Sequence, residues 1–171
     1  MPWFDATEAR ALVRLQGSLA RRPVTAAAHV LSSAGEHGWL WLTMAGAGMV
    51  LDRPRRSRWF EVGASVVLAH GSAVVLKRIV RRQRPSAPGL QVLDATASRL
   101  SFPSAHAAST SAAALSAAPL LGAAVTAPVP VAMAAARLVL GVHYPSDVVG
   151  GALLGAAGAR AAGRMVRSRR R

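Results

Sequence analysis

The chain has 171 residues, of which 52% are hydrophobic and only 16% are charged, a balance that is unusual for a soluble domain. It contains no cysteine, which excludes disulfides, thiolate metal sites and a cysteine nucleophile. A formal net charge of +14 would ordinarily suggest nucleic-acid binding, but many arginines stand in short runs beside apolar stretches. Such runs meet anionic lipid headgroups, so we expect a membrane as partner and no nucleic acid.

Two amphipathic segments precede the apolar part of the chain. Residues 5–20 alternate charged and apolar side chains at helical spacing, which predicts a helix that lies on a surface and is too polar to span a bilayer. Residues 24–34 are predicted to form a short interfacial helix that ends at Gly35. No apolar stretch with a cleavage site is visible, so we expect this region, residues 1–35, to remain in the protein.

Five apolar segments follow, and each is predicted to cross the membrane. At about 1.5 Å per residue, about 20 residues cover a hydrocarbon core of roughly 30 Å. The second segment has this length, the first is slightly short, and the fourth carries two prolines near its beginning. The expected fold class is therefore all-α, a polytopic membrane helix bundle of about five transmembrane helices. The segments are residues 38–51, 59–80, 104–122, 123–140 and 148–163.

Arginine placement predicts the orientation. The loop of residues 52–58 and the basic tail of residues 167–171 are both arginine-rich, and in a five-span protein they lie on the same side. The positive-inside rule places that side in the cytoplasm, so the polar segment 81–103 is expected to face outward, although arginines of its own count against this orientation. Residues 36–166 would form one domain embedded in the cytoplasmic membrane.

Cations gather around the polar segment. Lys77, Arg81 and Arg84 are spaced four and three residues apart, so on a helix they share one face. Pro85 is expected to end that helix. Arg137 lies in an apolar helix, where a charge without a partner is costly, and its planar guanidinium suits phosphate oxygens. Any one of these side chains alone would be explained by reaching to the headgroups, whereas together they indicate an anion site.

Two further motifs supply donors and titratable groups. The sequence Pro-Ser-Ala-His at residues 103–106 opens the third apolar helix, where free backbone N–H groups favour an anion and Ser104 adds a hydroxyl. His143 and Asp147 bracket the start of the fifth helix. The carboxylate can orient the imidazole through one nitrogen and leave the other free to attack. Taken singly, His106 is explained as an interfacial histidine and Asp147 as a helix cap.

In this order, Lys-x6-Arg-Pro, Pro-Ser-x-His and Arg-x5-His-x3-Asp resemble the three signature motifs of the type 2 phosphatidic acid phosphatase family. The resemblance covers about residues 59–160. It implies a membrane helix bundle that hydrolyses lipid phosphate esters or anhydrides without a metal or other cofactor. Two positions depart from the usual pattern, since Ala105 replaces a Gly and Ala136 replaces a Ser. We expect these changes to affect rate and substrate fit more than the reaction.

The resemblance also implies roles for individual residues. His143 would be the nucleophile that forms a phosphohistidine, Asp147 its orienting partner, and His106 the acid that protonates the leaving oxygen. The phosphoryl oxygens would be held by side chains and backbone N–H groups of the three motifs. These phosphate-binding residues are Lys77, Arg84, Ser104, Ala105 and Arg137, with the backbone of His106.

The substrate class rests on family analogy, because no residue identifies the lipid tail. A polyprenyl-linked phosphate or diphosphate is favoured, and phosphatidic acid or phosphatidylglycerol phosphate is the alternative. A protein of another class, one that only binds anionic lipid, would need the cations but not the trio of His106, His143 and Asp147. A soluble vanadate-dependent haloperoxidase has similar motifs but not five apolar spans. The sequence gives no indication of the oligomeric state.

Overall fold

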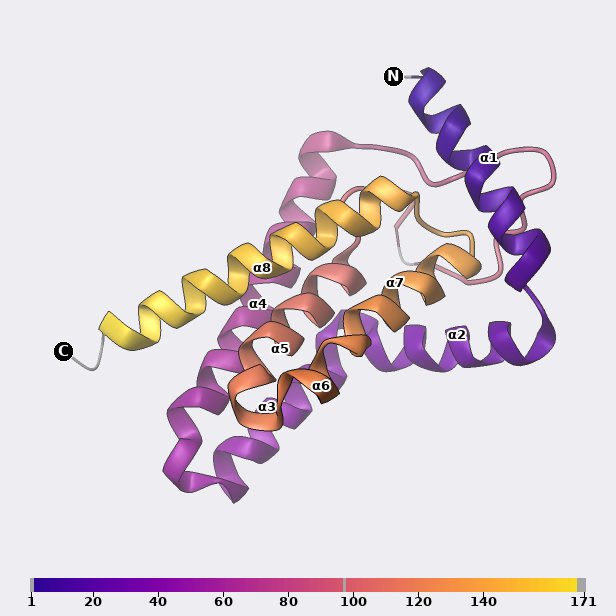
Figure 1. Ribbon diagram of the computed structural model, residues 1–171. Helices are drawn as coiled ribbons and strands as arrows, with labels where there is room; N and C mark the ends of the chain where they lie inside the picture. The colour runs from indigo at the N-terminus through magenta and orange to yellow at the C-terminus, as the bar shows by residue number, and fades with distance from the viewer. Residues whose placement is uncertain (1, 97, 169–171) are drawn as a thin grey trace.

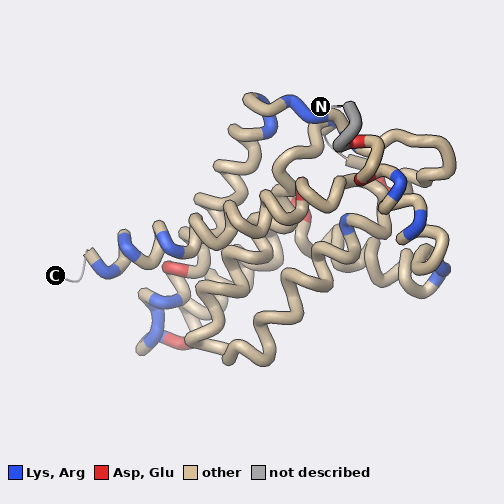
Figure 2. Tube along the Cα trace, turned by 45° about the horizontal axis from the view of Figure 1, so that its top comes forward, with Lys and Arg blue, Asp and Glu red and all other residues tan. Residues whose placement is uncertain are grey.

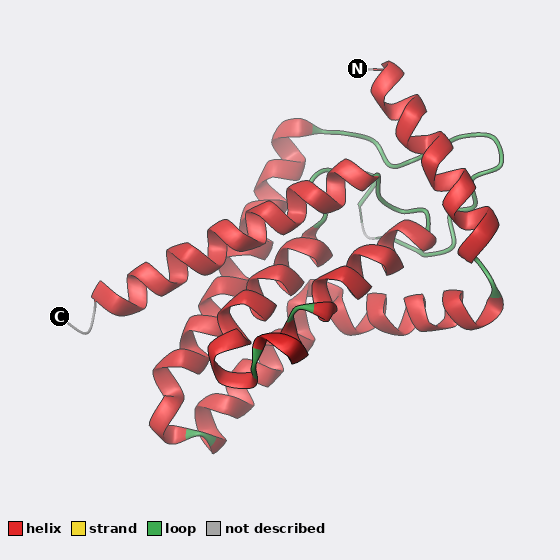
Figure 3. Cartoon of the chain, in the orientation of Figure 1, coloured by secondary structure: helices red, strands yellow, loops and turns green. Residues whose placement is uncertain are grey.

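Helices make up most of the chain that the structure describes, residues 2–96 and 98–168 of a computed structural model (Figure 1). Within these residues no strand is formed, and loops join the helices (Figure 3). The predicted all-α fold class is therefore confirmed. The elements are α1 (Pro2–Leu19), α2 (Arg22–Gly35), η1 (Glu36–Gly38), α3 (Trp39–Leu51), η2 (Arg53–Arg55), α4 (Arg56–Val80), α5 (Ala105–Leu121), α6 (Ala123–Thr126), α7 (Pro128–Val139) and α8 (Pro145–Ser168).

Local sequence sets the helix boundaries that matter for function. The α7 and α8 helices begin at Pro128 and Pro145, where a fixed φ and a missing N–H suit the first helical turn. The α4 helix ends at Val80. Arg81 then adopts a left-handed φ of 56°, and its N–H donates to the carbonyl of Lys77 at 3.0 Å. The chain leaves the helix axis at this residue and enters the long polar loop of residues 81–104.

The end of α4 overturns one prediction. Lys77, Arg81 and Arg84 do not share a helix face, because the helix stops before Arg81 and leaves Arg84 in the loop. Arg81 is exposed, whereas Lys77 is buried and Arg84 is half-buried. Two of the three cations therefore reach the interior, and they do so from different elements.

The centre of the bundle is formed by α4, α5 and α8, which pack closely along one another (Figure 1). Small residues allow this approach. A Cβ atom on Gly155 of α8 would come within 2.5 Å of the carbonyl oxygen of Ala108 and 2.8 Å of the Cβ of Ser111, both on α5. One on Gly158 would lie 3.1 Å from the Cβ of Ala69 on α4. Helix association through small residues is typical of packing in a bilayer, where van der Waals contact replaces the hydrophobic effect.

One helix of the described chain, residues Arg53–Val80, is both long and apolar enough to cross a membrane, and an 18-residue stretch within it has a mean hydropathy of 1.5. The apolar helix Ala123–Val139 is shorter. The predicted number of five spans therefore stays a prediction. The outer surface nevertheless carries many large apolar side chains, as a lipid-facing surface does. Those exposed on α4, α7 and α8 include Val67, Val75, Ile79, Val131, Val149 and Leu153.

The arginine-rich loop and the C-terminal part of α8 lie at one end of the bundle (Figure 2). Arg53 and Arg56 line the same surface hollow as Val166, and the carboxylate of Glu61 lies near Gly163. The loop of residues 81–104 and α1 lie at the opposite end, which also carries arginines, and the predicted orientation in the membrane stays a prediction (Figure 2). Of the predicted basic tail, residues 169–171 lie outside the described residues.

We expect Gly155→Ala to destabilise the bundle, because its methyl group would overlap the α5 backbone. Overpacking of this kind costs about 1–3 kcal/mol, and the thermal unfolding midpoint of the purified protein in detergent should fall. The matched control is Gly71→Ala on α4, where a Cβ meets nothing within 4 Å. Alanine is the better helix former by about 1 kcal/mol, so the control should be neutral or stabilising. Equal midpoints for the two variants would refute the tight α5–α8 contact.

Candidate active site

Six of the eight predicted site residues line one cavity of about 310 Å³, which is enclosed by α2, α4, α5, α7 and the polar loop. The other two, Ser104 and Asp147, are fully buried next to it. Three separate motifs thus converge on one place, although their roles in catalysis stay predictions. The six residues in the cavity wall are Lys77, Arg84, Ala105, His106, Arg137 and His143.

His143 and Asp147 lie together at the start of α8, and neither is exposed to solvent by more than 1%. The Nδ1 atom of His143 is 3.5 Å from Oδ2 of Asp147, which is longer than an ordinary hydrogen bond. Oδ2 accepts a hydrogen bond from the backbone N–H of Tyr144 at 2.8 Å. Asp147 therefore fixes the first turn of α8 and faces the imidazole at the same time, so the two interpretations of this residue are compatible.

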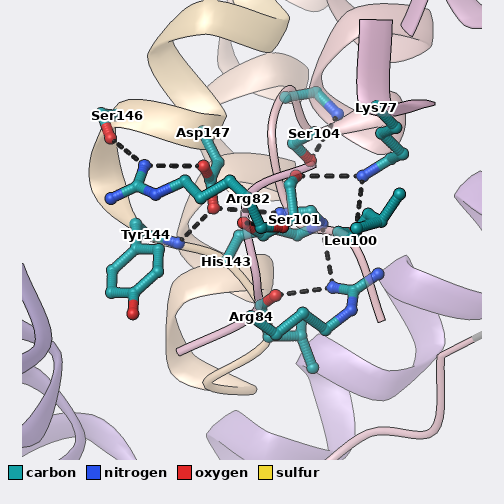
Figure 4. Close-up of polar contacts among 12 residues, drawn as sticks. Lys77, Arg82, Arg84, Leu100, Ser101, Ser104, His143, Tyr144, Ser146 and Asp147 are labelled. Atoms are coloured by element: carbon teal, nitrogen blue, oxygen red, sulfur yellow. Dashed lines mark hydrogen bonds and ion pairs between the residues drawn. The ribbon is translucent and has the colours of Figure 1, made fainter. Parts of the chain in front are cut away.

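The other ring nitrogen of His143 faces a cation. Its Nε2 atom is 3.4 Å from Nη1 of Arg84, which also donates to the carbonyl of Val142 at 2.6 Å (Figure 4). A guanidinium can only donate, so we infer that Nε2 carries the lone pair and Nδ1 the proton. This is the tautomer that a nucleophile acting through Nε2 requires.

Burial and nearby positive charge keep this imidazole neutral. Burial is the main cause that holds the pKa of His143 well below its usual value, and the charges of Arg84 and Arg137 act in the same direction. Burial also lowers the pKa of Arg84 to about 10, which leaves the guanidinium protonated at neutral pH. A neutral ring beside a charged guanidinium is the combination needed to attack a phosphate.

Lys77 connects α4 to the polar loop. Its Nζ atom donates to the carbonyl oxygens of Leu100 at 3.1 Å and Ser101 at 3.0 Å (Figure 4). An ammonium group has three N–H donors, so one remains for a ligand in the cavity. The side chain is therefore positioned by the loop and can still bind an anion.

Arg137 is 2% exposed and is paired with Asp94, a loop carboxylate that the sequence motifs do not include. Its Nη1 atom donates to Oδ2 of Asp94 at 3.0 Å and to the hydroxyl of Ser32. The Ser32 hydroxyl in turn donates to the same carboxylate at 2.7 Å. Burial alone would raise the pKa of Asp94, but these hydrogen bonds and the Arg137 charge lower it. The buried Nε atom of Arg137 has no partner among the described residues.

His106 is oriented from the N-terminal half of the chain. Its Nε2 atom lies 3.0 Å from the carbonyl oxygen of Ser32, which can only accept, so Nε2 carries a proton. Nδ1 is then the nitrogen available for proton transfer in the cavity. The predicted role of His106 as the acid requires a proton on this second nitrogen.

The second motif also shapes the backbone. Ser104 is the N-cap of α5, and its hydroxyl accepts from the N–H of Ala107 at 3.4 Å. Its own N–H donates to the carbonyl of Asp147 at 2.9 Å, which joins the second and third motifs. Ser104 does not line the cavity, so its contact with phosphate stays a prediction. Ala136, the second departure from the family pattern, packs with Ala28 in an apolar cluster.

Sequence reasoning missed three polar residues that hold the site together. Ser32 and Asp94 engage Arg137 as described, and Arg82 donates to Oδ1 of Asp147 at 2.8 Å. Asp94 could have been noticed as one of only seven acidic residues in a strongly basic chain. Among the residues that the structure describes, no group of three or more His, Asp or Glu side chains is arranged to hold a metal ion.

The site and the helical fold define a PAP2 phosphatase. The sequence model of the PAP2 superfamily matches residues 58–171, so the chain belongs to this family and the predicted resemblance is confirmed. It is 52% identical over 141 residues to the decaprenylphosphoryl-5-phosphoribose phosphatase of Mycolicibacterium smegmatis, covering 82% of this chain and 78% of that protein. It is 50% identical over 156 residues to the Mycobacterium tuberculosis protein of the same name, covering 87% and 85%.

A solved structure shares the fold. It is the PAP2 type phosphatidylglycerolphosphate phosphatase from Bacillus subtilis, a transmembrane protein, with a TM-score of 0.70. The match covers 98% of this chain and 86% of that chain at 24% sequence identity. The helical arrangement is therefore that of a known membrane phosphatase.

We expect His143→Ala to abolish phosphate release while the protein stays folded, because the buried ring is the predicted attacking group. A general acid contributes about 10²- to 10⁴-fold, and loss of a nucleophile should exceed that. His106→Ala is the matched comparison. Its defect should shrink with an aryl phosphate, whose leaving group needs no proton, whereas the defect of His143→Ala should not. Substantial turnover by His143→Ala with any substrate would remove the nucleophile from this position.

Proposed function

We propose that this protein is a phosphatase of the membrane that hydrolyses a phosphomonoester on a polyprenyl-linked lipid, with decaprenylphosphoryl-5-phosphoribose as the favoured substrate. The observation that carries the reaction is the buried His143, whose Nε2 lies beside Arg84 at a cavity lined by Lys77, Arg78, Arg84 and Arg137. The substrate class comes from the two mycobacterial relatives, which share half of their aligned residues with this chain.

The reaction proceeds in two displacement steps. Nε2 of His143 attacks phosphorus, the bond to the leaving oxygen breaks, and His106 delivers a proton to that oxygen. Asp147 stabilises the positive charge that develops on the ring. Water then attacks the phosphorus of the phosphohistidine while His106 takes a proton from that water, and the P–N bond breaks to release inorganic phosphate and the neutral imidazole of His143. This pair of steps regenerates the enzyme and consumes one water.

Cations stabilise the transferring group. Its three equatorial oxygens carry most of the transition-state charge, and Lys77, Arg84 and Arg137 surround the place where they would lie. Such preorganised donors are usually the largest contribution to catalysis, and here they supply the charge that a metal supplies elsewhere.

The wall of the cavity supports a headgroup that carries hydroxyls. Besides the cations it includes Glu36, Asp94, Ser33 and Thr96, which offer acceptors and donors to a sugar. A carboxylate repels a phosphate but accepts hydrogen bonds from hydroxyl groups. A pentose phosphate therefore fits this mixed wall better than the short glycerol backbone of phosphatidic acid does.

A substrate panel tests the proposal. Purified protein in detergent should release phosphate from synthetic decaprenylphosphoryl-5-phosphoribose with a kcat/KM at least about tenfold above that for phosphatidic acid or phosphatidylglycerol phosphate, since lost headgroup hydrogen bonds cost about 1–3 kcal/mol. EDTA should leave the rate unchanged. A preference for phosphatidic acid would overturn the substrate, and activity that vanishes with EDTA and returns with a divalent ion would overturn the cation-based mechanism.

The proposal also states how the parts of the chain are arranged relative to the membrane. Residues 36–166 would form the membrane-embedded domain, residues 1–35 would lie on its outer surface, and residues 167–171 would be a cytoplasmic tail. The grouping of the arginine-rich loop with the basic end of α8 supports this arrangement, because such a cluster favours the cytoplasmic side, whereas the cations at the opposite end are in part those that line the cavity. The cavity would then open to the outside of the cytoplasmic membrane.

Cysteine labelling tests this orientation in a chain without native cysteines. On intact cells, a thiol reagent that cannot cross the membrane should label Ala95→Cys, which lies at the cavity, but not Ser57→Cys, at the opposite end. Both should react after the cells are permeabilised, which controls for exposure. Labelling of Ser57→Cys alone in intact cells would reverse the topology and place the substrate pool in the cytoplasm.

A further inference from the structure

The guanidinium of Arg82 joins α1 to the predicted catalytic carboxylate. Its Nη1 atom donates to Oδ1 of Asp147 at 2.8 Å and to the hydroxyl of Ser146 at 2.6 Å (Figure 4). On its other side, Nη2 donates to Oδ1 of Asp5 at 2.5 Å and to Oε2 of Glu8 at 2.6 Å. Both acids belong to α1, so one side chain is bound to two helices from opposite ends of the chain.

Glu8 also binds the start of α8 directly, through Ser146. Its Oε1 atom accepts from the backbone N–H of Ser146 at 2.7 Å, and its Oε2 atom accepts from the Ser146 hydroxyl at 2.8 Å. Arg82 in addition lies over the ring of Tyr144, with its central carbon 4.0 Å from the ring centroid. The α1 helix therefore holds the first turn of α8 in place at Ser146, the residue next to Asp147, whose carboxylate faces His143.

These contacts leave Asp147 one orientation. Oδ1 is held by Arg82 and Oδ2 by the N–H of Tyr144, and the residue is fully buried. The carboxylate plane is thus set at 3.5 Å from the imidazole of His143. Arg82 itself does not line the cavity, so any effect it has on the reaction passes through Asp147.

We infer that α1 is a positioning element for the reaction, in which Glu8 holds Arg82 and Arg82 holds Asp147 against His143. This inference rests on the proposed function. It gives a role to a helix that lies outside residues 58–171, the part of the chain matched by the family. The motifs supply the reacting groups, and the N-terminal helix completes their alignment.

The first test separates kcat from KM. Arg82→Gln should lower kcat about 10²-fold, the loss that a displacement of about 1 Å causes in an aligned site. KM should change less than about threefold, because the phosphate-binding cations are untouched. Glu8→Gln should lower kcat in the same direction, and Arg82→Lys should recover part of the Arg82→Gln loss. Substrate is decaprenylphosphoryl-5-phosphoribose in detergent.

The matched control is Glu61→Gln at the other end of α4. This carboxylate is also buried and pairs with an arginine, Arg58, at 3.2 Å, so the substitution removes the same kind of ion pair. It should leave kcat unchanged. The thermal unfolding midpoints of Glu8→Gln and Glu61→Gln show whether a fall in kcat comes from lower stability of the protein or from the location of the lost ion pair next to Asp147. An equal loss of kcat in the control would overturn the inference.

A double-mutant cycle gives the sharpest test. If Arg82 acts only through Asp147, then Arg82→Gln should cost nothing further in kcat once Asp147→Asn is present. A merely structural role would instead lower kcat by the same factor in both backgrounds, and that additivity would overturn the inference. Activity of the unsubstituted protein tests the proposed function separately. Turnover by that protein, combined with an unaffected Arg82→Gln, would leave the phosphatase intact and remove only the role of α1.

Discussion

Buried positive charge is the constraint on which the arrangement of this protein depends. A cation in an apolar bundle must find hydrogen-bond acceptors, because the cost of an uncompensated charge is several kcal/mol. Lys77 finds two loop carbonyls, Arg84 finds the carbonyl of Val142, and Arg137 finds Asp94. Each pairing draws the polar loop back over the ends of the helices. The loop that encloses the cavity is therefore held there by the charges that the cavity needs.

The helices give these charges a rigid frame. Close packing of α8 on α4 and α5 through Gly155 and Gly158 leaves little freedom for the start of α8 to shift. His143 and Asp147 lie at that start, so the backbone contact sets their separation from Ser104 and His106 at the start of α5. The small side chains at the helix contacts therefore determine both the packing of the bundle and the geometry of the cavity.

The sequence predicted the residues of the motifs better than the residues that hydrogen-bond to them and hold them in place. Lys77, Arg84, Arg137 and the two histidines could be placed together because each belongs to a motif with fixed spacing. The hydrogen bond from Arg82 to Asp5 joins residues 77 positions apart, and that from Arg137 to Asp94 joins residues 43 positions apart, so neither pair leaves a local sequence pattern. The break of α4 at Arg81 was missed because arginine seldom adopts positive φ.

Hydropathy does not define the number of spans, because several helices are short or carry charges. The helices α3, α5 and α7 have 13, 17 and 12 residues, each short for a bilayer, and α8 has 24 but carries arginines in its second half. Length and composition describe a helix in isolation. A helix that leans on neighbours and covers a polar cavity meets the lipid along only part of its surface.

The pairing of Asp94 with Arg137 bears on how the site releases its product. In the proposed reaction, a phosphate entering the cavity would meet Arg137 already paired with Asp94 through Nη1, so the phosphate would partly replace that carboxylate. The carboxylate of Asp94 would compete with inorganic phosphate for Arg137 after the second step of the proposed reaction. Tight holding of a ground state slows turnover without helping the chemical step. As an internal counter-ion in the proposed reaction, Asp94 would let Lys77, Arg84 and Arg137 stabilise the transition state without binding the released phosphate too tightly.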